Sequence, residues 1–203
     1  MCIRDRFKNI NAQHEMSYDD SRNEGTGKMN DELRSVHQSC PATKFILSGF
    51  SQGAVIAGDV ADEIGGGQGV VPAESIAGVA LIADGRRQNG VGQNPGRKVG
   101  GVGAEIALQP VSGLVQPIVP GASMRGARQN GFGSLADRTF QICAPNDSVC
   151  DAPPNVTNAL ERAQGLIAAN GVHAQYASNS GVIDGTTANQ WVVGWARQLI
   201  DAA

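Results

Sequence analysis

The sequence lacks the features that mark membrane-spanning and nucleic-acid-binding chains. No segment approaches the roughly 18 uninterrupted apolar residues that a membrane-spanning helix needs. The sequence has no run of lysine or arginine, and its net charge of −3 and pI near 5.6 argue against a nucleic-acid partner. Residues 1–8 carry charges, but no apolar core follows them, so they do not resemble a signal peptide.

Charged residues are also scarce, at 17% of the chain, whereas hydrophobic residues make up 41%. This composition is typical of a soluble globular protein, and 203 residues are enough for one good-sized core. Residues 1–29 are polar and lack strand or helix periodicity, so we expect a poorly defined N-terminal segment followed by one α/β domain over residues 30–203. Residues 25–28 resemble the end of a phosphate-binding loop, but Met29 stands where a serine or threonine should follow, so we expect a flexible polar stretch there.

A Gly-x-Ser-x-Gly motif at residues 49–53 follows an apolar run and precedes a helix-compatible segment at residues 54–64. This is the context of a nucleophile elbow, a sharp strand-to-helix turn that exposes its central side chain. We expect Ser51 on that turn, with the free amides of the helix start directed at charge that develops beside it. In a chain with 27 glycines the motif alone also fits an ordinary turn, so a base and an acid must support it.

Further strands and helices alternate along the chain. We expect a short helix at residues 30–38, a buried strand at 75–83, a further strand at 137–143, and helices at 155–170 and 187–202. Strand, helix and strand in this order predict a right-handed βαβ unit and a parallel sheet. The glycine- and proline-rich excursion at residues 84–133 is interpreted either as a surface loop or as an apolar wall beside the site. The apolar residues of the last helix predict its packing side: Trp191, Val192, Trp195, Leu199 and Ile200.

A serine becomes a good nucleophile only when a neighbouring base removes its proton and an acid holds that base. In hydrolases with a strand–elbow–helix motif, the acid and then the histidine follow the serine along the chain. The chain has three histidines. His14 and His37 precede Ser51, so only His173 has the required position.

Two aspartates follow predicted strands, where catalytic groups of parallel sheets gather. Asp84 follows the strand at 75–83, and Asp147 follows the strand at 137–143. Asp147 is better placed, because a disulfide between Cys143 and Cys150 would close a small loop around it. Asp84 stays as the alternative, since an aspartate in a Pro-Asn-Asp-Ser sequence often only stabilises the turn.

Together, residues 49–54, the Cys143-x-x-x-Asp147-x-x-Cys150 loop and His173-x-x-Tyr176 resemble the cutinase family of small α/β-hydrolases, especially its actinobacterial members. Cys40-Pro41 and residues 131–138 fit the same pattern, and the resemblance covers roughly residues 30–203. It implies a three-layer α/β/α sandwich with a mainly parallel central sheet. It also implies a secreted or cell-envelope serine esterase of cutinase, lipase or polyesterase type.

The resemblance assigns roles to individual residues. Ser51 would be the nucleophile, Asp147 the acid and His173 the base, with the backbone amide of Gln52 as one oxyanion donor. It implies a disulfide between Cys143 and Cys150, no metal, no cofactor, and a monomer that acts on ester, lipid or polyester substrates. We expect an apolar rim around the site, formed by Phe50, Val149, Val172 and parts of residues 106–120.

The chain departs from the family pattern before the elbow. The family carries a first core strand, followed by a serine or threonine that completes the oxyanion hole, and residues 1–43 contain no such motif. We therefore expect a chain truncated at its start, in which the partner of Cys40 stays open and Cys2 is one candidate. Two alternatives remain: a phospholipase or thioesterase of the same fold, and a catalytically silent fragment or lipid-surface binder without a complete oxyanion hole.

Overall fold

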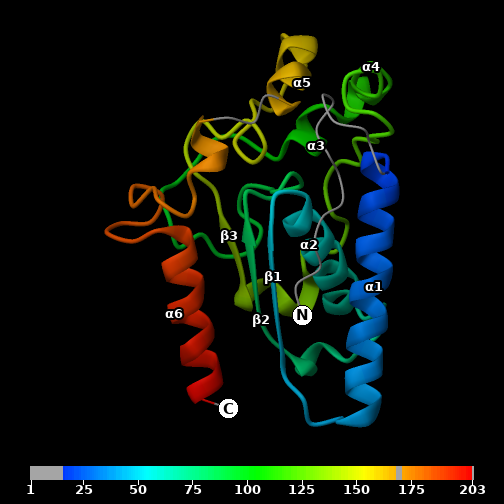
Figure 1. The fold of residues 1–203 in the computed structure, drawn as a ribbon, viewed down its shortest axis with the longest axis vertical. Helices are drawn as coiled ribbons and strands as arrows, with labels where there is room; N and C mark the ends of the chain where they lie inside the picture. The colour runs from blue at the N-terminus through cyan, green and yellow to red at the C-terminus, as the bar shows by residue number, and fades with distance from the viewer. Residues whose placement is uncertain (1–15, 168–170, 203) are drawn as a thin grey trace.

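The computed structural model describes residues 16–167 and 171–202, and these form a parallel three-stranded sheet with helices on both faces (Figure 1). The strands lie in the order β1 (Phe45–Phe50), β2 (Ile76–Ile82) and β3 (Thr139–Ile142). Phe50 pairs with Ile82, and Ile82 pairs with Ile142, so the strands end together at one edge. The predicted α/β fold with a parallel sheet is confirmed.

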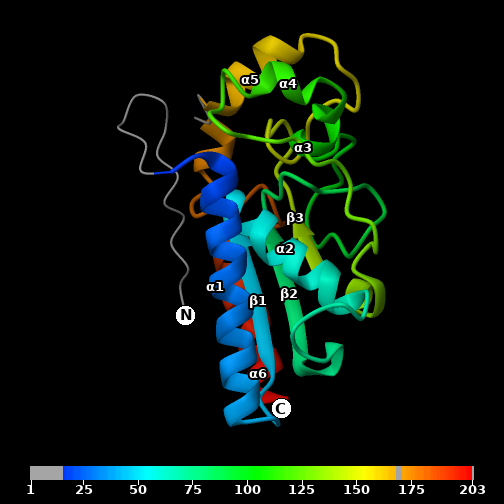
Figure 2. The same ribbon diagram turned by 90° about the vertical axis from the view of Figure 1, so that its right-hand side faces the viewer.

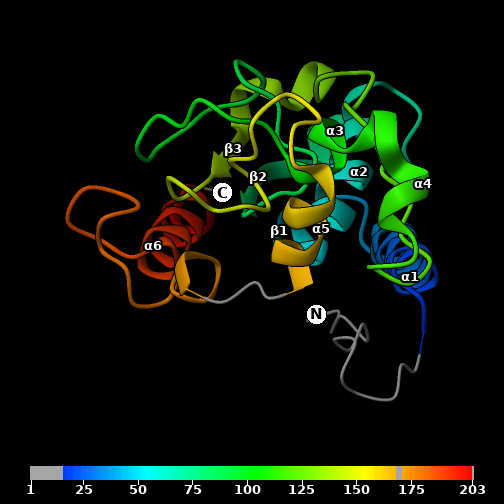
Figure 3. The same ribbon diagram turned by 90° about the horizontal axis from the view of Figure 1, so that it is seen from above.

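Helices α1 (Tyr18–Ser39) and α2 (Gln52–Gly65) cover one face of the sheet, and α6 (Ala188–Asp201) covers the other (Figures 1 and 2). The short elements are α3 (Ala104–Ala107), α4 (Ser112–Val115), α5 (Ala159–Ile167), η1 (Ala73–Ser75), η2 (Gln109–Val111), η3 (Gly133–Arg138) and η4 (Gly171–Ala174). Helices α3, α4 and α5 gather beyond the carboxyl ends of the strands (Figures 1 and 2), and they overlie that end of the sheet in the view from above (Figure 3). None of the described helices combines the length and the apolar character that crossing a membrane requires.

Small residues allow both helical layers to approach the sheet closely. In α2, Ala54, Ala57 and Ala61 are completely buried. On the opposite face, a Cβ at Gly78 of β2 would lie 2.5 Å from the ring of Trp195, so only glycine admits α6 at this distance. The predicted packing side of α6 is wrong at its end, because Ile200 is 66% exposed.

The long helix α1 occupies residues 18–29, most of the described part of the segment expected to be poorly defined, and it extends the short helix expected at residues 30–38. It begins at Tyr18, after the N-cap Ser17, whose side chain accepts a hydrogen bond from the amide of Asp20. Residues 25–28 are therefore helical. The backbone amide of Tyr18 donates to the carbonyl of Pro120, so contacts from a distant segment stabilise the helix start. Cys2 and His14 lie outside the described residues.

A buried ionic cluster fastens the excursion at residues 84–133 to α2. Asp59 of α2 accepts from Arg86 and Arg128, and its other oxygen lies 2.7 Å from Nη1 of Arg125. Arg128 also binds Asp84 directly after β2, with 2.6 Å between Nη1 and Oδ2. Each buried charge has an opposite charge beside it, and the attraction between these charges offsets part of the free-energy cost of removing them from water.

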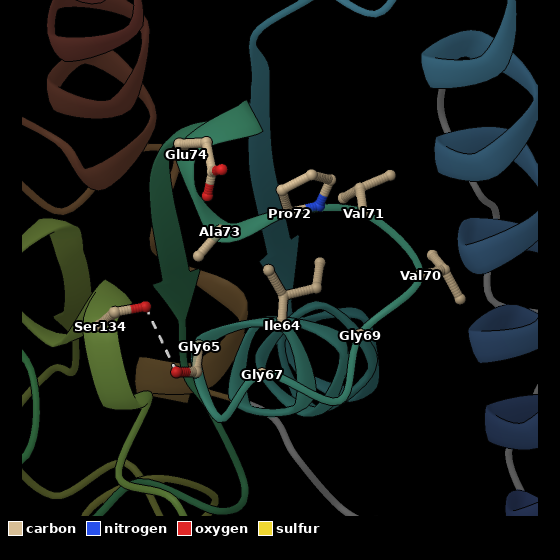
Figure 4. Close-up of a pocket in the computed structure, with 10 residues that line it drawn as sticks. All are labelled: Ile64, Gly65, Gly67, Gly69, Val70, Val71, Pro72, Ala73, Glu74 and Ser134. Atoms are coloured by element: carbon tan, nitrogen blue, oxygen red, sulfur yellow. Dashed lines mark hydrogen bonds between the residues drawn. The ribbon is translucent and has the colours of Figure 1, made fainter.

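A separate pocket lies at the amino ends of β2 and β3, where α2 ends (Figure 4). Its polar contributors include Glu74 and Ser134, and the Ser134 hydroxyl donates to the carbonyl of Gly65 at 3.3 Å. The strands run from this end toward the elbow, so the pocket lies at the opposite edge of the sheet from Ser51.

Candidate active site

Ser51 occupies the turn between β1 and α2 in a conformation that few residues adopt. Its φ is 55° and its ψ is −122°, and its amide donates to the carbonyl of Ile82 on the neighbouring strand. A Cβ at Gly49 would lie 2.1 Å from the carbonyl oxygen of Gly53, so the turn requires glycine there. Strained backbone of this kind persists only where the surrounding contacts hold it, and it is frequent at functional sites.

His173 lies between Ser51 and Asp147. Its Nε2 is 3.1 Å from the Ser51 hydroxyl oxygen, and its Nδ1 is 3.0 Å from Oδ2 of Asp147 and 3.1 Å from Oδ1. An ionised carboxylate can only accept, so Nδ1 carries the ring proton and Nε2 is left to accept from the serine. The structure thus brings together Ser51, His173 and the aspartate that the cysteine loop favoured.

Asp147 follows β3 in a loop that the predicted disulfide closes. Cys143 and Cys150 are bonded, with Cα atoms 5.9 Å apart. Inside the loop, the amide of Val149 donates to Oδ1 of Asp147 at 2.9 Å. Asp147 is only 1% exposed, so its charge acts on His173 with little solvent screening. Cys40 is an exposed free thiol.

The alternative acid, Asp84, has a different partner. Both of its oxygens accept from Arg128, at 2.6 and 3.0 Å, and its Oδ1 also accepts from the amide of Arg86. The carboxylate therefore belongs to the ionic cluster beneath the excursion. Its position after β2 satisfied the sequence criterion, but nothing in the local sequence indicated a guanidinium 44 residues away.

Gln52 is the first residue of α2. The backbone amides of the first helical turn have no acceptor within the helix, so the amide of Gln52 is free to bind another group. Its side chain is buried and bonded at both ends. Oε1 accepts from the Ser21 hydroxyl at 3.0 Å, and Nε2 donates to a backbone carbonyl of α1 at 2.9 Å. The start of α1 therefore fixes the residue that follows Ser51.

The excursion also fixes the loop that carries Asp147. The buried Arg87 donates through Nε to the carbonyl of Cys150 at 2.8 Å. The amides of Val102 and Ala152 each donate to the carbonyl of the other at 2.8 Å. This role of Arg87 was not predictable from the sequence, because its contact with the loop is a backbone carbonyl, which leaves no signature in side-chain spacing.

Aromatic side chains surround the imidazole. The ring of Phe50 stacks on His173, with centroids 5.0 Å apart and planes inclined by 29°. Phe50 is 45% exposed, and Leu114 in the excursion is 55% exposed. Val149 and Val172, the other residues expected at the rim, are half-buried. Among residues 16–167 and 171–202, no group of three histidine, cysteine or acidic side chains is arranged to hold a metal ion.

Comparisons with known proteins match most of this chain to one family. The model of the Cutinase family matches residues 6–194. A carboxylesterase Culp6 homolog from Corynebacterium glutamicum is 67% identical over 196 residues, which are 97% of this chain and 63% of the relative. A probable carboxylesterase Culp7 from Mycobacterium tuberculosis is 28% identical over 137 residues, 66% of this chain and 62% of that protein. The chain thus spans less than two thirds of the length of both relatives.

Solved structures show the same fold. A cutinase-like protein from Cryptococcus sp. is 25% identical, with a TM-score of 0.51 over 78% of this chain and 64% of that chain. An acetyl xylan esterase structure is 19% identical, with a TM-score of 0.51 over 91% of this chain and 73% of that chain. At this low identity the second likeness concerns the fold alone.

Proposed function

Because this chain belongs to the cutinase family, we propose that it is a serine carboxylic-ester hydrolase that works through a covalent acyl-enzyme. The observation that carries the proposal is the relay of hydrogen bonds from Ser51 through His173 to Asp147. Each member of the relay has the partner that its task requires: a base for the nucleophile, and a buried carboxylate for the base. The two curated relatives are described as a carboxylesterase homolog and a probable carboxylesterase.

Catalysis begins when Ser51 transfers its hydroxyl proton to Nε2 of His173 and its oxygen attacks the ester carbonyl carbon. The buried charge of Asp147 stabilises the imidazolium that forms. His173 then gives the proton to the departing alcohol, which leaves the acyl group on Ser51. Water, activated by the same histidine, attacks the acyl-enzyme and releases the carboxylic acid.

The tetrahedral intermediate carries a negative charge on the former carbonyl oxygen, and donors must already point at that position. We assign the backbone amide of Gln52 as one such donor, because it opens α2, where the helix dipole adds positive potential. Its buried side chain, bonded to α1 at both ends, holds this amide in place. Loss of a single oxyanion donor costs on the order of 3 kcal/mol in the transition state.

The substrates we propose are esters of lipids or aliphatic polymers. An apolar acyl chain needs an apolar surface beside the nucleophile, and the exposed ring of Phe50 provides one next to Ser51. The site would act outside the cytoplasm, since the disulfide between Cys143 and Cys150 is typical of oxidising compartments.

Hydrolysis of p-nitrophenyl esters of increasing chain length tests the proposal. We expect turnover by the wild-type chain and none by Ser51→Ala, with equal thermal stability of the two proteins. Parallel assays with a phospholipid and an acyl-thioester identify the preferred acyl donor. A folded wild-type chain that hydrolyses none of these probes would support the catalytically silent alternative instead.

A further inference from the structure

The hydroxyl of Tyr176 lies 2.7 Å from Oδ2 of Asp147. We propose that Tyr176 is a positioning residue for the reaction: it fixes the carboxylate against His173 and tunes how strongly that carboxylate attracts the imidazolium. This inference rests on the proposed function, because it assigns a task within the same relay.

The direction of this hydrogen bond is set by the surroundings of the hydroxyl. Its oxygen accepts from the amide of Ala144 at 2.8 Å, so its single proton is free to go to Asp147. Tyr176 is 3% exposed, which keeps water away from the contact. Burial, followed by the charge of Asp147, raises the pKa of Tyr176 well above its ordinary value, so the hydroxyl stays a donor.

The bond from Tyr176 also completes the restraint on the carboxylate of Asp147. Oδ1 accepts from the amide of Val149, and Oδ2 accepts from Tyr176, so each oxygen has a fixed donor besides His173. Rotation of the carboxylate would break one of these bonds inside a buried site, where an unmade bond is costly. The plane of the carboxylate is therefore fixed in the orientation that meets Nδ1 of His173.

The ring of Tyr176 also packs against Phe50, the aromatic residue beside His173. Its edge meets Phe50, with centroids 5.7 Å apart, and Phe50 stacks on the imidazole of His173. The other charged group that acts on the hydroxyl is Arg87, which donates to the carbonyl of Cys150. The Cys150 sulfur lies 3.4 Å from the hydroxyl and has no proton to give, because it is in the disulfide.

The chain offers a matched control, since its two tyrosines each donate to a buried carboxylate. Tyr176→Phe removes the donor to Asp147, and Tyr18→Phe removes the donor to Glu105. We expect Tyr176→Phe to lower kcat about tenfold with KM unchanged, because a carboxylate that is free to rotate no longer holds the imidazole of His173 in the reactive orientation. Tyr18→Phe should change kcat less than twofold, because it keeps the backbone carbonyl of Tyr18 that accepts from the Gln52 side chain.

The pH profile of kcat/KM adds a measurement that a purely structural role would not change. Without the tyrosine proton, the Asp147 charge acts more strongly on His173, so the acid limb of the profile should move to higher pH in Tyr176→Phe. In an Asp147→Asn background, Tyr176→Phe should have less than a twofold further effect on kcat. An equal loss in both backgrounds would overturn the proposal, because Tyr176 would then act by another route.

Replacement of tyrosine by 3-fluorotyrosine in the Tyr18→Phe variant provides a second measurement that leaves Tyr176 in place. Fluorination makes the phenol a stronger donor, so the acid limb should move to lower pH, and an unmoved limb contradicts the inference. A wild-type chain without Ser51-dependent hydrolysis would refute the proposed function and this inference together. An active wild type with unchanged variants would refute this inference alone.

Discussion

Arg128 holds both carboxylate oxygens of Asp84, with 2.6 Å between Nη1 and Oδ2 and 3.0 Å between Nη2 and Oδ1. The same guanidinium donates through Nε to Asp59 at 2.9 Å. One buried arginine therefore bridges a carboxylate in α2 and a carboxylate in the loop after β2. This contact separates Asp84 from the proposed catalytic relay and explains how the excursion stays attached to α2. It also makes the stability of the molecule depend on a side chain far from Ser51 in the sequence.

Arg128→Met should destabilise the protein strongly, because it leaves Asp59 and Asp84 buried with less compensation. We expect a loss of about 3–5 kcal/mol in the free energy of unfolding, the usual effect of breaking a buried ion pair. Arg34→Met is the matched control, since Arg34 pairs with Asp31 on the exposed side of α1. It should cost less than about 1 kcal/mol. Urea denaturation measures both, and equal losses would contradict the role of the cluster.

The pH dependence of stability should reveal Asp59. Burial opposes its charge, but the neighbouring Arg128, Arg125 and Arg86 outweigh burial and hold the pKa of Asp59 below its ordinary value near 3.8. A depressed pKa contributes stability that is present above the unfolded-state value and is lost as the pH falls through the folded-state value. The stability difference between wild type and Asp59→Asn should therefore be constant above pH ~5 and shrink in more acidic solution. A constant difference down to pH ~2 would contradict this assignment.

The two aspartates that the sequence left open should separate in their effects. Asp147→Asn keeps the shape of the side chain but removes the charge that stabilises the imidazolium, so kcat should fall by about 10⁴-fold with little change in stability. Asp84→Asn should lower the free energy of unfolding instead, because Arg128 loses a charged partner. Steady-state kinetics and thermal unfolding of both variants check the division. A larger kinetic loss in Asp84→Asn would reverse the assignment.

Removal of the disulfide should affect both stability and rate. Closing a loop of this size stabilises a protein by about 2–3 kcal/mol, so Cys143→Ala combined with Cys150→Ala should lose roughly that amount. The freed loop would hold Asp147 less firmly, and kcat should fall while KM changes little. Cys40→Ala serves as the control, because its thiol is exposed and free. Unchanged kcat in the double variant would show that Tyr176 and Arg87 suffice to hold the loop.

Local sequence patterns predicted the strands, α2 and the elbow, because each depends on residues close together in the chain. The start of α1 could not be predicted in this way. It depends on the cap Ser17 and on carbonyls at Pro120 and Gly121, which arrive only when the chain is folded. The glycines in this helix lower its intrinsic propensity, and tertiary contacts compensate for that loss.

The same reasoning applies to the site. The chain order selected Ser51 and His173 and left two aspartates open, of which the cysteine loop favoured Asp147. The structure brings Ser51, His173 and Asp147 into contact. The supporting residues were not predictable, because Arg87 acts on backbone carbonyls and Arg128 bridges acids that are distant in sequence. Such contacts depend on the folded arrangement of loops, which periodicity and motifs do not encode.

Reaction of the folded chain with a fluorophosphonate, followed by peptide mapping, tests most directly whether the hydroxyl of Ser51 is activated. The proposed relay predicts a single adduct on Ser51 that forms rapidly in the wild type, slowly in His173→Gln and not at all in Ser51→Ala. An unmodified Ser51 in folded protein, or equal labelling rates with and without His173, would contradict it.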